Sequence, residues 1–254
     1  MKNATFLERY LSQTLSTEEQ VIEFPVSLEH TVWDGKNTRD AAITAVMKCI
    51  SVVFDEPTTD DATLLLTVMS ELTGQELSCE HLSHRMHMQP YIVLHMLGAV
   101  ELAGIWRHLK CFNREDEIVN DKSKGYLVDV GLACQMFAIS NPVAIVEHRS
   151  WGALFETFVV NRLAQQLPDD THIFYWRTAH GSAEVDVVLQ RGKVLYPIEI
   201  KSAVHVSVSN ARKIEIFTRY YEADYQIAPG LVIYTGNRYY AMENGVFAVP
   251  AAMI

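Results

Sequence analysis

Two acidic side chains and a lysine stand close together in the stretch 175–201, which is otherwise rich in apolar residues. Asp186 lies in the segment E-V-D-V-V-L, and Glu199 and Lys201 lie in the segment I-E-I-K. Two carboxylates and an ammonium group have the composition of a chemical site. Acids gathered in this way suit metal-assisted contact with a polyanion, because a bound cation inverts the local charge.

Three consecutive strands are expected to position these side chains. The first strand ends at residues 175–177, the second covers 184–190 and the third covers 195–201. Turn residues separate them, at Gly181-Ser182 and again at Arg191-Gly192-Lys193. The pattern therefore predicts a three-stranded meander.

The alternation of side chains along a strand predicts how the three groups meet. On the second strand, Val185 and Val187 should share one face and Asp186 should lie on the other. On the third strand, Glu199 and Lys201 should share the face opposite the apolar residues. The two strands thus bring all three polar groups to one patch.

A helix is predicted to begin near Gly152 and to continue to about Gln166, and it carries a third acid, Glu156. Glu156 shares its face with three apolar residues, Val159, Val160 and Leu163. An unpaired buried carboxylate is unfavourable. Glu156 therefore either belongs to the site or forms an ion pair, for which Arg177 and Arg162 are the candidate partners.

After the meander, we expect a helix over 209–221 and strands over 231–234 and 238–242. The order helix, three strands, helix, strand fills about a hundred residues, which is a normal domain size. Four basic residues are candidates for contacts to a nucleic-acid backbone: Arg177, Arg212, Lys213 and Arg219. For the last three, a solvated helix face is the alternative.

The chain before this domain divides at about residue 58. Residues 1–58 form a helical segment of unclear role, and residues 59–146 show three helices followed by a hairpin. That order is typical of a winged helix. Because the segment carries few basic residues, docking of a protein partner competes with reading of DNA as its role.

Composition sets the bounds of these interpretations. The 254 residues are 49% hydrophobic and carry a formal charge of −10, of which −9 falls on the first 150 residues. The four cysteines form no C-x-x-C pair, so we expect free thiols in a reducing compartment. Since no signal peptide or spanning segment is evident, we expect a cytoplasmic protein without a membrane partner.

Four segments together resemble the core of the PD-(D/E)xK nuclease superfamily: G-A-L-F-E-T-F-V, Y-W-R-T, E-V-D-V-V-L and I-E-I-K-S. More narrowly, residues 59–235 resemble the C-terminal region of a prokaryotic family of AAA-type ATPases of otherwise unknown function. There, a nuclease-like domain follows a winged helix, and a segment similar to residues 124–132 joins the two. The relatives usually carry an N-terminal P-loop module. This sequence shows no P-loop and hence no ATP site.

The resemblance implies a fold and a mechanism. The fold is α+β/α/β, with an N-terminal helical region, a winged helix and then, over 147–254, a restriction-endonuclease-like αβββαβ domain. Asp186 and Glu199 would hold Mg²⁺ or Mn²⁺, with Glu156 contacting the metal directly or through water. Lys201 would position the attacking water or stabilise transition-state charge. The expected activity is Mg²⁺-dependent phosphodiester hydrolysis, on DNA before RNA.

Two alternatives stay open. The charged residues could form only a salt-bridge cluster on the sheet, because ion-pair networks imitate active sites. In the second alternative, the protein is a non-catalytic module that binds nucleic acid or a protein. That module would work with an ATPase supplied by another polypeptide or assemble as a homo-oligomer.

Overall fold

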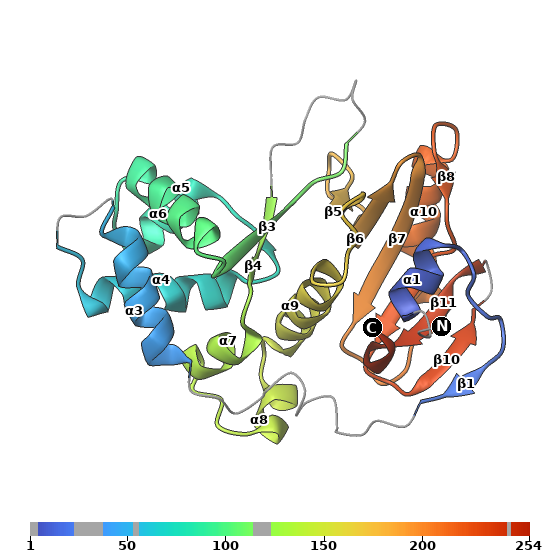
Figure 1. The fold of residues 1–254 in the computed structure, drawn as a ribbon, viewed down its shortest axis with the longest axis horizontal. Helices are drawn as coiled ribbons and strands as arrows, with labels where there is room; N and C mark the ends of the chain where they lie inside the picture. The colour runs from blue at the N-terminus through green and yellow to red at the C-terminus, as the bar shows by residue number, and fades with distance from the viewer. Residues whose placement is uncertain (1–4, 23–37, 53–55, 114–122, 243–244) are drawn as a thin grey trace. The chain divides into compact units, whose positions relative to one another are not determined.

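The computed structural model describes residues 5–22, 38–52, 56–113, 123–242 and 245–254 (Figure 1). Helices, one large mixed sheet and one small sheet make up the described chain, which confirms a mixed α and β protein. Two compact units can be distinguished by their contacts. Unit 1 comprises residues 1–28, 110–121 and 158–254, and unit 2 comprises residues 29–109 and 122–157.

These units do not coincide with the predicted boundaries 1–58, 59–146 and 147–254. The first described residues belong to unit 1, together with most of the C-terminal part of the chain. Helix α9 (Trp151–Ala164) begins in unit 2 and ends in unit 1. Contacts between residues far apart in the sequence cause the difference, and local patterns do not report such contacts.

Within the described residues, unit 1 is built on an eight-stranded sheet with the order β1-β10-β11-β9-β7-β6-β5, and β8 pairs with β7 outside this path. The strands are β1 (Gln20–Val21), β5 (Thr171–Arg177), β6 (Glu184–Arg191), β7 (Val194–Lys201), β8 (Gln226–Ile227), β9 (Leu231–Tyr234), β10 (Arg238–Ala241) and β11 (Phe247–Pro250). The antiparallel meander β5-β6-β7 is confirmed. Strands β8 and β11 were not predicted.

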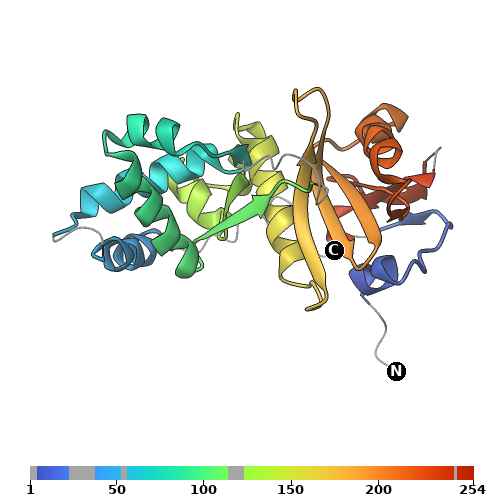
Figure 2. The same ribbon diagram turned by 90° about the horizontal axis from the view of Figure 1, so that it is seen from above.

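Helices cover both faces of this sheet. Helix α1 (Phe6–Leu11) and helix α10 (Arg212–Tyr221) lie on opposite sides of it (Figure 2). Tyr196 of β7 packs edge-on against Tyr10 of α1 at 5.2 Å between ring centroids. The neighbouring residue, Leu195, packs in a cluster with Phe217 of α10. Successive side chains alternate faces, so each helix takes one side of β7.

Strand β6 carries one extra residue beside Asp186. The step from Phe174 to Trp176 on β5 is matched by the step from Val188 to Val185 on β6. Such a bulge interrupts the alternation of faces and often re-aims a side chain next to a site. Val185 accordingly packs in the same cluster as Val188, so Val185 departs from the simple alternation predicted for this strand.

Unit 2 contains helices and a small sheet of order β2-β4-β3. Its elements are α3 (Arg39–Ile50), α4 (Thr59–Leu72), β2 (Gln75–Glu76), α5 (Cys79–Met86), α6 (Pro90–Leu102), β3 (Trp106–Lys110), β4 (Ser123–Leu127), α7 (Val130–Met136) and α8 (Pro142–Glu147). Three helices followed by paired strands agree with the element order predicted for residues 59–146. The identification of this region as a winged helix stays a prediction.

The structure bears on the state of the cysteines and on the presence of membrane-spanning helices. Among the described residues, the four cysteines form no disulfide, as predicted: Cys49, Cys79, Cys111 and Cys134. In the described part of the chain, no helix has both the length and the apolar character needed to span a bilayer.

Candidate active site

Asp186, Glu199 and Lys201 meet in unit 1, and Lys213 of α10 joins them. The Lys201 Nζ lies 2.5 Å from Glu199 Oε1 and 3.9 Å from Asp186 Oδ2. The Lys213 Nζ lies 3.1 Å from the same Glu199 oxygen. The predicted convergence of two acids and a lysine is therefore present, with a second lysine added.

The main chain holds Asp186 in place. The Ile200 N–H donates a hydrogen bond of 2.8 Å to Asp186 Oδ2, and the Asp186 side chain is only 9% exposed. A hydrogen bond from the backbone fixes the direction of the carboxylate oxygen that accepts it. Asp186 is thus oriented by the strand that carries Glu199 and Lys201.

Glu199 is the most deeply buried of these groups, with a fully buried side chain. Its Oε2 atom has no hydrogen-bond partner among the described residues. Buried polar atoms without partners are rare in proteins, and each one calls for an explanation. A divalent cation would satisfy this oxygen, so the donor set fits a bound metal.

The composition of the site indicates which metal it would suit. The described residues contain no group of three or more His, Cys, Asp or Glu that could hold a metal ion. A pair of carboxylates is sufficient for Mg²⁺, which keeps several waters and commonly uses one or two protein carboxylates together with substrate phosphates. Asp186 and Glu199 can supply such a pair.

The environment shifts the ionisation of both Glu199 and Lys213. Burial, followed by the nearby Asp186 charge, raises the pKa of Glu199 from 4.5 to about 7, although Lys201 and Lys213 oppose the shift. For Lys213, burial lowers the pKa, but the charges of Glu199 and Asp186 outweigh it and raise the pKa above its ordinary value. Near neutral pH the site therefore holds a carboxyl group poised between its two forms.

The stability of unit 1 should depend on pH through Glu199. Between pH 4.5 and about 7, the folded state keeps a proton on Glu199 that the unfolded state has already lost. Stability therefore falls as pH rises through this window, by about 3 kcal/mol in total. Urea unfolding at a series of pH values measures this loss.

The matched control for this prediction is Glu199→Gln, which is neutral at every pH. The difference in unfolding free energy between wild type and Glu199→Gln should change across the window and be constant below pH 4.5. A difference that is flat from pH 4.5 to 7 would show that burial does not raise the pKa of Glu199.

The sequence indicates Lys213 only as a candidate contact for a nucleic-acid backbone and does not predict its place beside Glu199. Helix α10 buries Ile214, Phe217 and Tyr221 against the sheet. Lys213 directly precedes the first of these residues, at the flank of the buried face, and its side chain is 43% exposed. The apolar spacing of the helix could have indicated this position, but not the strand that it faces.

Glu156 has partners within unit 2. Its Oε1 accepts hydrogen bonds from the Lys124 Nζ at 3.2 Å and from the Tyr126 hydroxyl at 2.8 Å. Lys124 is itself buried, so it forms a buried ion pair with Glu156. The prediction that Glu156 also contacts a metal stays a prediction.

The remaining candidates for backbone contacts occupy different positions in unit 1. Arg212 and Arg219 lie at exposed positions of α10. Arg177 ends β5, and its guanidinium packs over Gly181, where an added Cβ would lie 2.3 Å from Nη2. Their binding of nucleic acid stays a prediction.

The residues of the candidate site lie within a part of the chain that matches a known protein family. Residues 151–254 match the model of a family described as a domain of unknown function (DUF4143). The uncharacterized protein Rv2008c of Mycobacterium tuberculosis is 26% identical over 189 residues, which cover 74% of this chain and 41% of the relative. The uncharacterized protein Mb2031c of Mycobacterium bovis has the same values. The chain thus spans about two fifths of the length of these curated relatives.

Proposed function

We propose that unit 1 is a nuclease of the PD-(D/E)xK type that hydrolyses phosphodiester bonds, with DNA as substrate and Mg²⁺ as cofactor. One observation carries the proposal: within the described part of the chain, the buried Glu199 has no hydrogen-bond partner for its Oε2, and it lies beside Asp186 and two lysines. The element order α9, β5-β6-β7, α10, β9 supports a restriction-endonuclease-like fold. Fold alone does not establish activity, so the argument depends on the site.

Each residue of the site has a distinct task in this proposal. Asp186 and Glu199 would hold Mg²⁺, which when bound polarises a phosphodiester and lowers the pKa of a water molecule. Lys201 is close enough to both acids to orient that water or to stabilise negative charge as it develops on the phosphate. Lys213 adds a second positive charge and favours the ionised form of Glu199.

The direct test is incubation of the protein with single-stranded and double-stranded DNA in the presence of Mg²⁺ or Mn²⁺. We expect cleavage with either ion and none in EDTA. Binding of Mg²⁺ is measured separately from cleavage, through its effect on stability. At pH 8, Mg²⁺ should stabilise wild type and leave the stability of Glu199→Gln unchanged. Absence of both cleavage and stabilisation would overturn the proposal.

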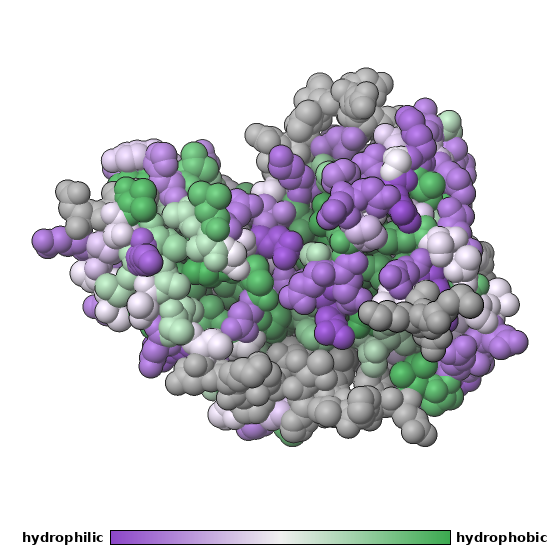
Figure 3. Space-filling model, viewed as in Figure 1, coloured by the Kyte–Doolittle hydropathy of each residue, from purple (hydrophilic) through white to green (hydrophobic). Residues whose placement is uncertain are grey.

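A second candidate function is supported by the surface of unit 2. Helix α6 exposes a row of apolar side chains: Tyr91 at 64%, Leu94 at 58% and Leu102 at 92%. Figure 3 shows hydrophobic atoms at the surface over α5 and α6. An apolar row is better suited to a protein partner than to phosphates. We propose an ATPase module as this partner, since residues 59–235 resemble the C-terminal region of a family of AAA-type ATPases.

Salt dependence of DNA binding separates the two functions. Phosphate contacts make affinity fall steeply as salt rises. If the nuclease proposal holds, affinity for DNA should show such a slope. If unit 2 acts only as a docking module and unit 1 has no DNA substrate, no salt-dependent binding should be detected at any salt concentration.

A further inference from the structure

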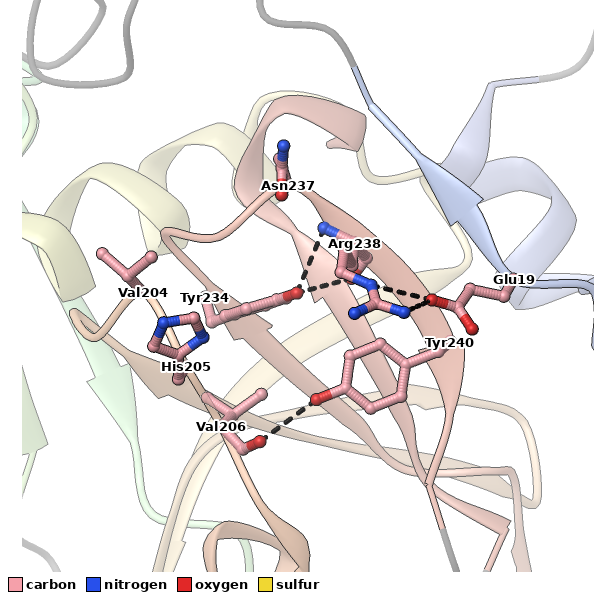
Figure 4. A pocket seen from close by; sticks show the side chains of 8 residues that line it. All are labelled: Glu19, Val204, His205, Val206, Tyr234, Asn237, Arg238 and Tyr240. Carbon is pink, nitrogen blue, oxygen red and sulfur yellow. Dashed lines mark hydrogen bonds and ion pairs between the residues drawn. The ribbon is translucent and has the colours of Figure 1, made fainter.

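A small pocket of unit 1 lies next to the candidate active site. It has a volume of about 240 Å³, and its lining includes Glu19, His205, Tyr234, Arg238 and Tyr240 (Figure 4). Pockets for drug-sized ligands usually measure about 300–1,000 Å³. This pocket therefore suits a smaller group, of the size of a single ring system.

The pocket and the acids share the same pair of strands. Tyr234 of β9 is the Cα partner of Lys201 of β7. Just beyond this pair, the Thr235 N–H donates to the Ala203 carbonyl at 3.3 Å, so the segments that follow β9 and β7 continue side by side. Neighbouring strands lie about 4.8 Å apart, and paired residues face the same side. The pocket wall thus begins one strand away from Lys201.

Aromatic rings form much of this wall. The Tyr234 hydroxyl donates to the Arg238 carbonyl at 2.6 Å, and the Tyr240 hydroxyl donates to the Val206 carbonyl at 3.1 Å. In Figure 4 both hydroxyls are directed at the main chain, with the imidazole of His205 near Tyr234. Because the main chain holds the two tyrosine hydroxyls, their rings are fixed in orientation. Ring faces are sequence-tolerant platforms for bases.

Gly236 is required for this arrangement. A Cβ at this position would lie 2.3 Å from a Tyr234 ring carbon and 2.4 Å from the Val204 carbonyl oxygen. The turn between β9 and β10 can therefore approach the Tyr234 ring only without a side chain. This close approach keeps the ring in its place in the wall.

The charge of the pocket argues for a neutral ligand. The Arg238 Nε donates to Glu19 Oε1 at 2.8 Å, and Figure 4 shows the two side chains joined in this pair. The carboxylate compensates the guanidinium charge, so the pocket does not present a bare cation to a phosphate. The pair does present hydrogen-bond donors and acceptors, which the edge of a base also carries.

From these observations we propose that the pocket receives one unpaired nucleobase of the strand that is cleaved at the neighbouring acids. The substrate class is then single-stranded DNA, or a duplex end or branch from which a base can leave the stack. This inference rests on the proposed nuclease function and specifies its substrate. A fully paired duplex lacks a free base and should bind less tightly.

Binding measured in EDTA tests the pocket apart from cleavage. The probes are a fluorescent oligothymidine, a duplex of equal length and an abasic single strand with the same phosphates. Wild type should bind oligothymidine at least about fivefold more tightly than the abasic strand, since stacking of one base typically contributes about that factor or more. It should also prefer oligothymidine to the duplex.

Variants locate the binding in the pocket. Tyr240→Ala and the exposed His205→Ala should each lose most of the preference for bases and keep their affinity for the abasic strand. Tyr240→Phe, which keeps the ring and loses only the hydrogen bond to the Val206 carbonyl, should retain most of the preference for bases. The His205 side chain is exposed, so His205→Ala should not disturb folding, and a loss of base preference in this variant can be assigned to the pocket.

Three outcomes would overturn the inference. Unchanged binding of oligothymidine by both Tyr240→Ala and His205→Ala would show that the pocket takes no base. Competition by free thymidine monophosphate as effective as that by the oligonucleotide would show a mononucleotide site instead of a strand site. Equal affinity for the duplex would exclude an unpaired base. If DNA is still cleaved in these cases, the nuclease proposal itself stands.

Discussion

An Asp186→Asn protein should fold normally and cleave DNA on the order of 10²–10³-fold more slowly than wild type. Asparagine removes the charge that would bind Mg²⁺, while its side-chain oxygen can still accept the Ile200 N–H. The Asp186 charge also raises the pKa of Glu199, so its loss should not destabilise the buried acid. Single-turnover cleavage at saturating Mg²⁺ and thermal unfolding measure the two effects.

The control for this prediction is Asp170→Asn, the same chemical change at an exposed ion pair with Arg191 in the same unit. Exposed ion pairs contribute little to stability. We expect a cleavage rate close to that of wild type. Full activity of Asp186→Asn would remove this carboxylate from the mechanism, and with it the central part of the proposed site.

Substitution of Lys201 and substitution of Lys213 should have different effects on DNA cleavage. Lys201→Met is expected to lose on the order of 10²–10⁴-fold in cleavage rate, because this side chain would contact the water or the reacting phosphate. Lys213→Met should lose less, because Lys213 is a positioning residue that acts through Glu199. Its charge lowers the pKa of Glu199, so its removal should shift the pH profile of cleavage to higher pH.

The pH profile therefore distinguishes the two roles. At a pH above the shifted pKa, Lys213→Met should regain most of its activity, whereas Lys201→Met should not. Lys213→Arg, which keeps the charge, should retain a profile close to that of wild type. A Lys213→Met protein with an unshifted profile would show that the pairing with Glu199 has no part in catalysis.

Much of the site could be predicted from local patterns. The predicted strands 184–190 and 195–201 correspond to β6 and β7, and the turns between β5, β6 and β7 lie where their turn residues stand. Because an antiparallel meander pairs neighbouring segments, its register follows from the turns and the apolar pattern. For this reason the convergence of Asp186, Glu199 and Lys201 is encoded within a short stretch.

Some local details, in β6 and at the start of α4, were decided by packing. The extra residue beside Asp186 has no sequence signal of its own, and it appears only when β6 is matched to both of its neighbours. The N-cap of α4 is Thr58, and Asp61 completes the capping box. The extra residue of β6 and the N-cap of α4 both depend on which backbone N–H groups need a hydrogen-bond partner in the folded chain.

Larger differences come from contacts over long sequence separations. Strand β1 pairs with β10, and Tyr10 donates a hydrogen bond to the Pro229 carbonyl, so the N-terminal residues complete a sheet made by the C-terminal ones. The pocket likewise joins Glu19 to residues beyond 203. No periodicity within a window of the sequence records such pairs.

The sequence alone determined which groups are available for chemistry and which strands carry them, because side-chain type, alternation and turn residues are local properties. Only the tertiary structure decided that Lys213 faces Glu199 and that one buried oxygen of Glu199 has no hydrogen-bond partner among the residues that the structure describes. Those features depend on where α10 packs across the sheet. Packing of this kind is the sum of many weak apolar contacts between distant segments, and the complete fold is needed to define it.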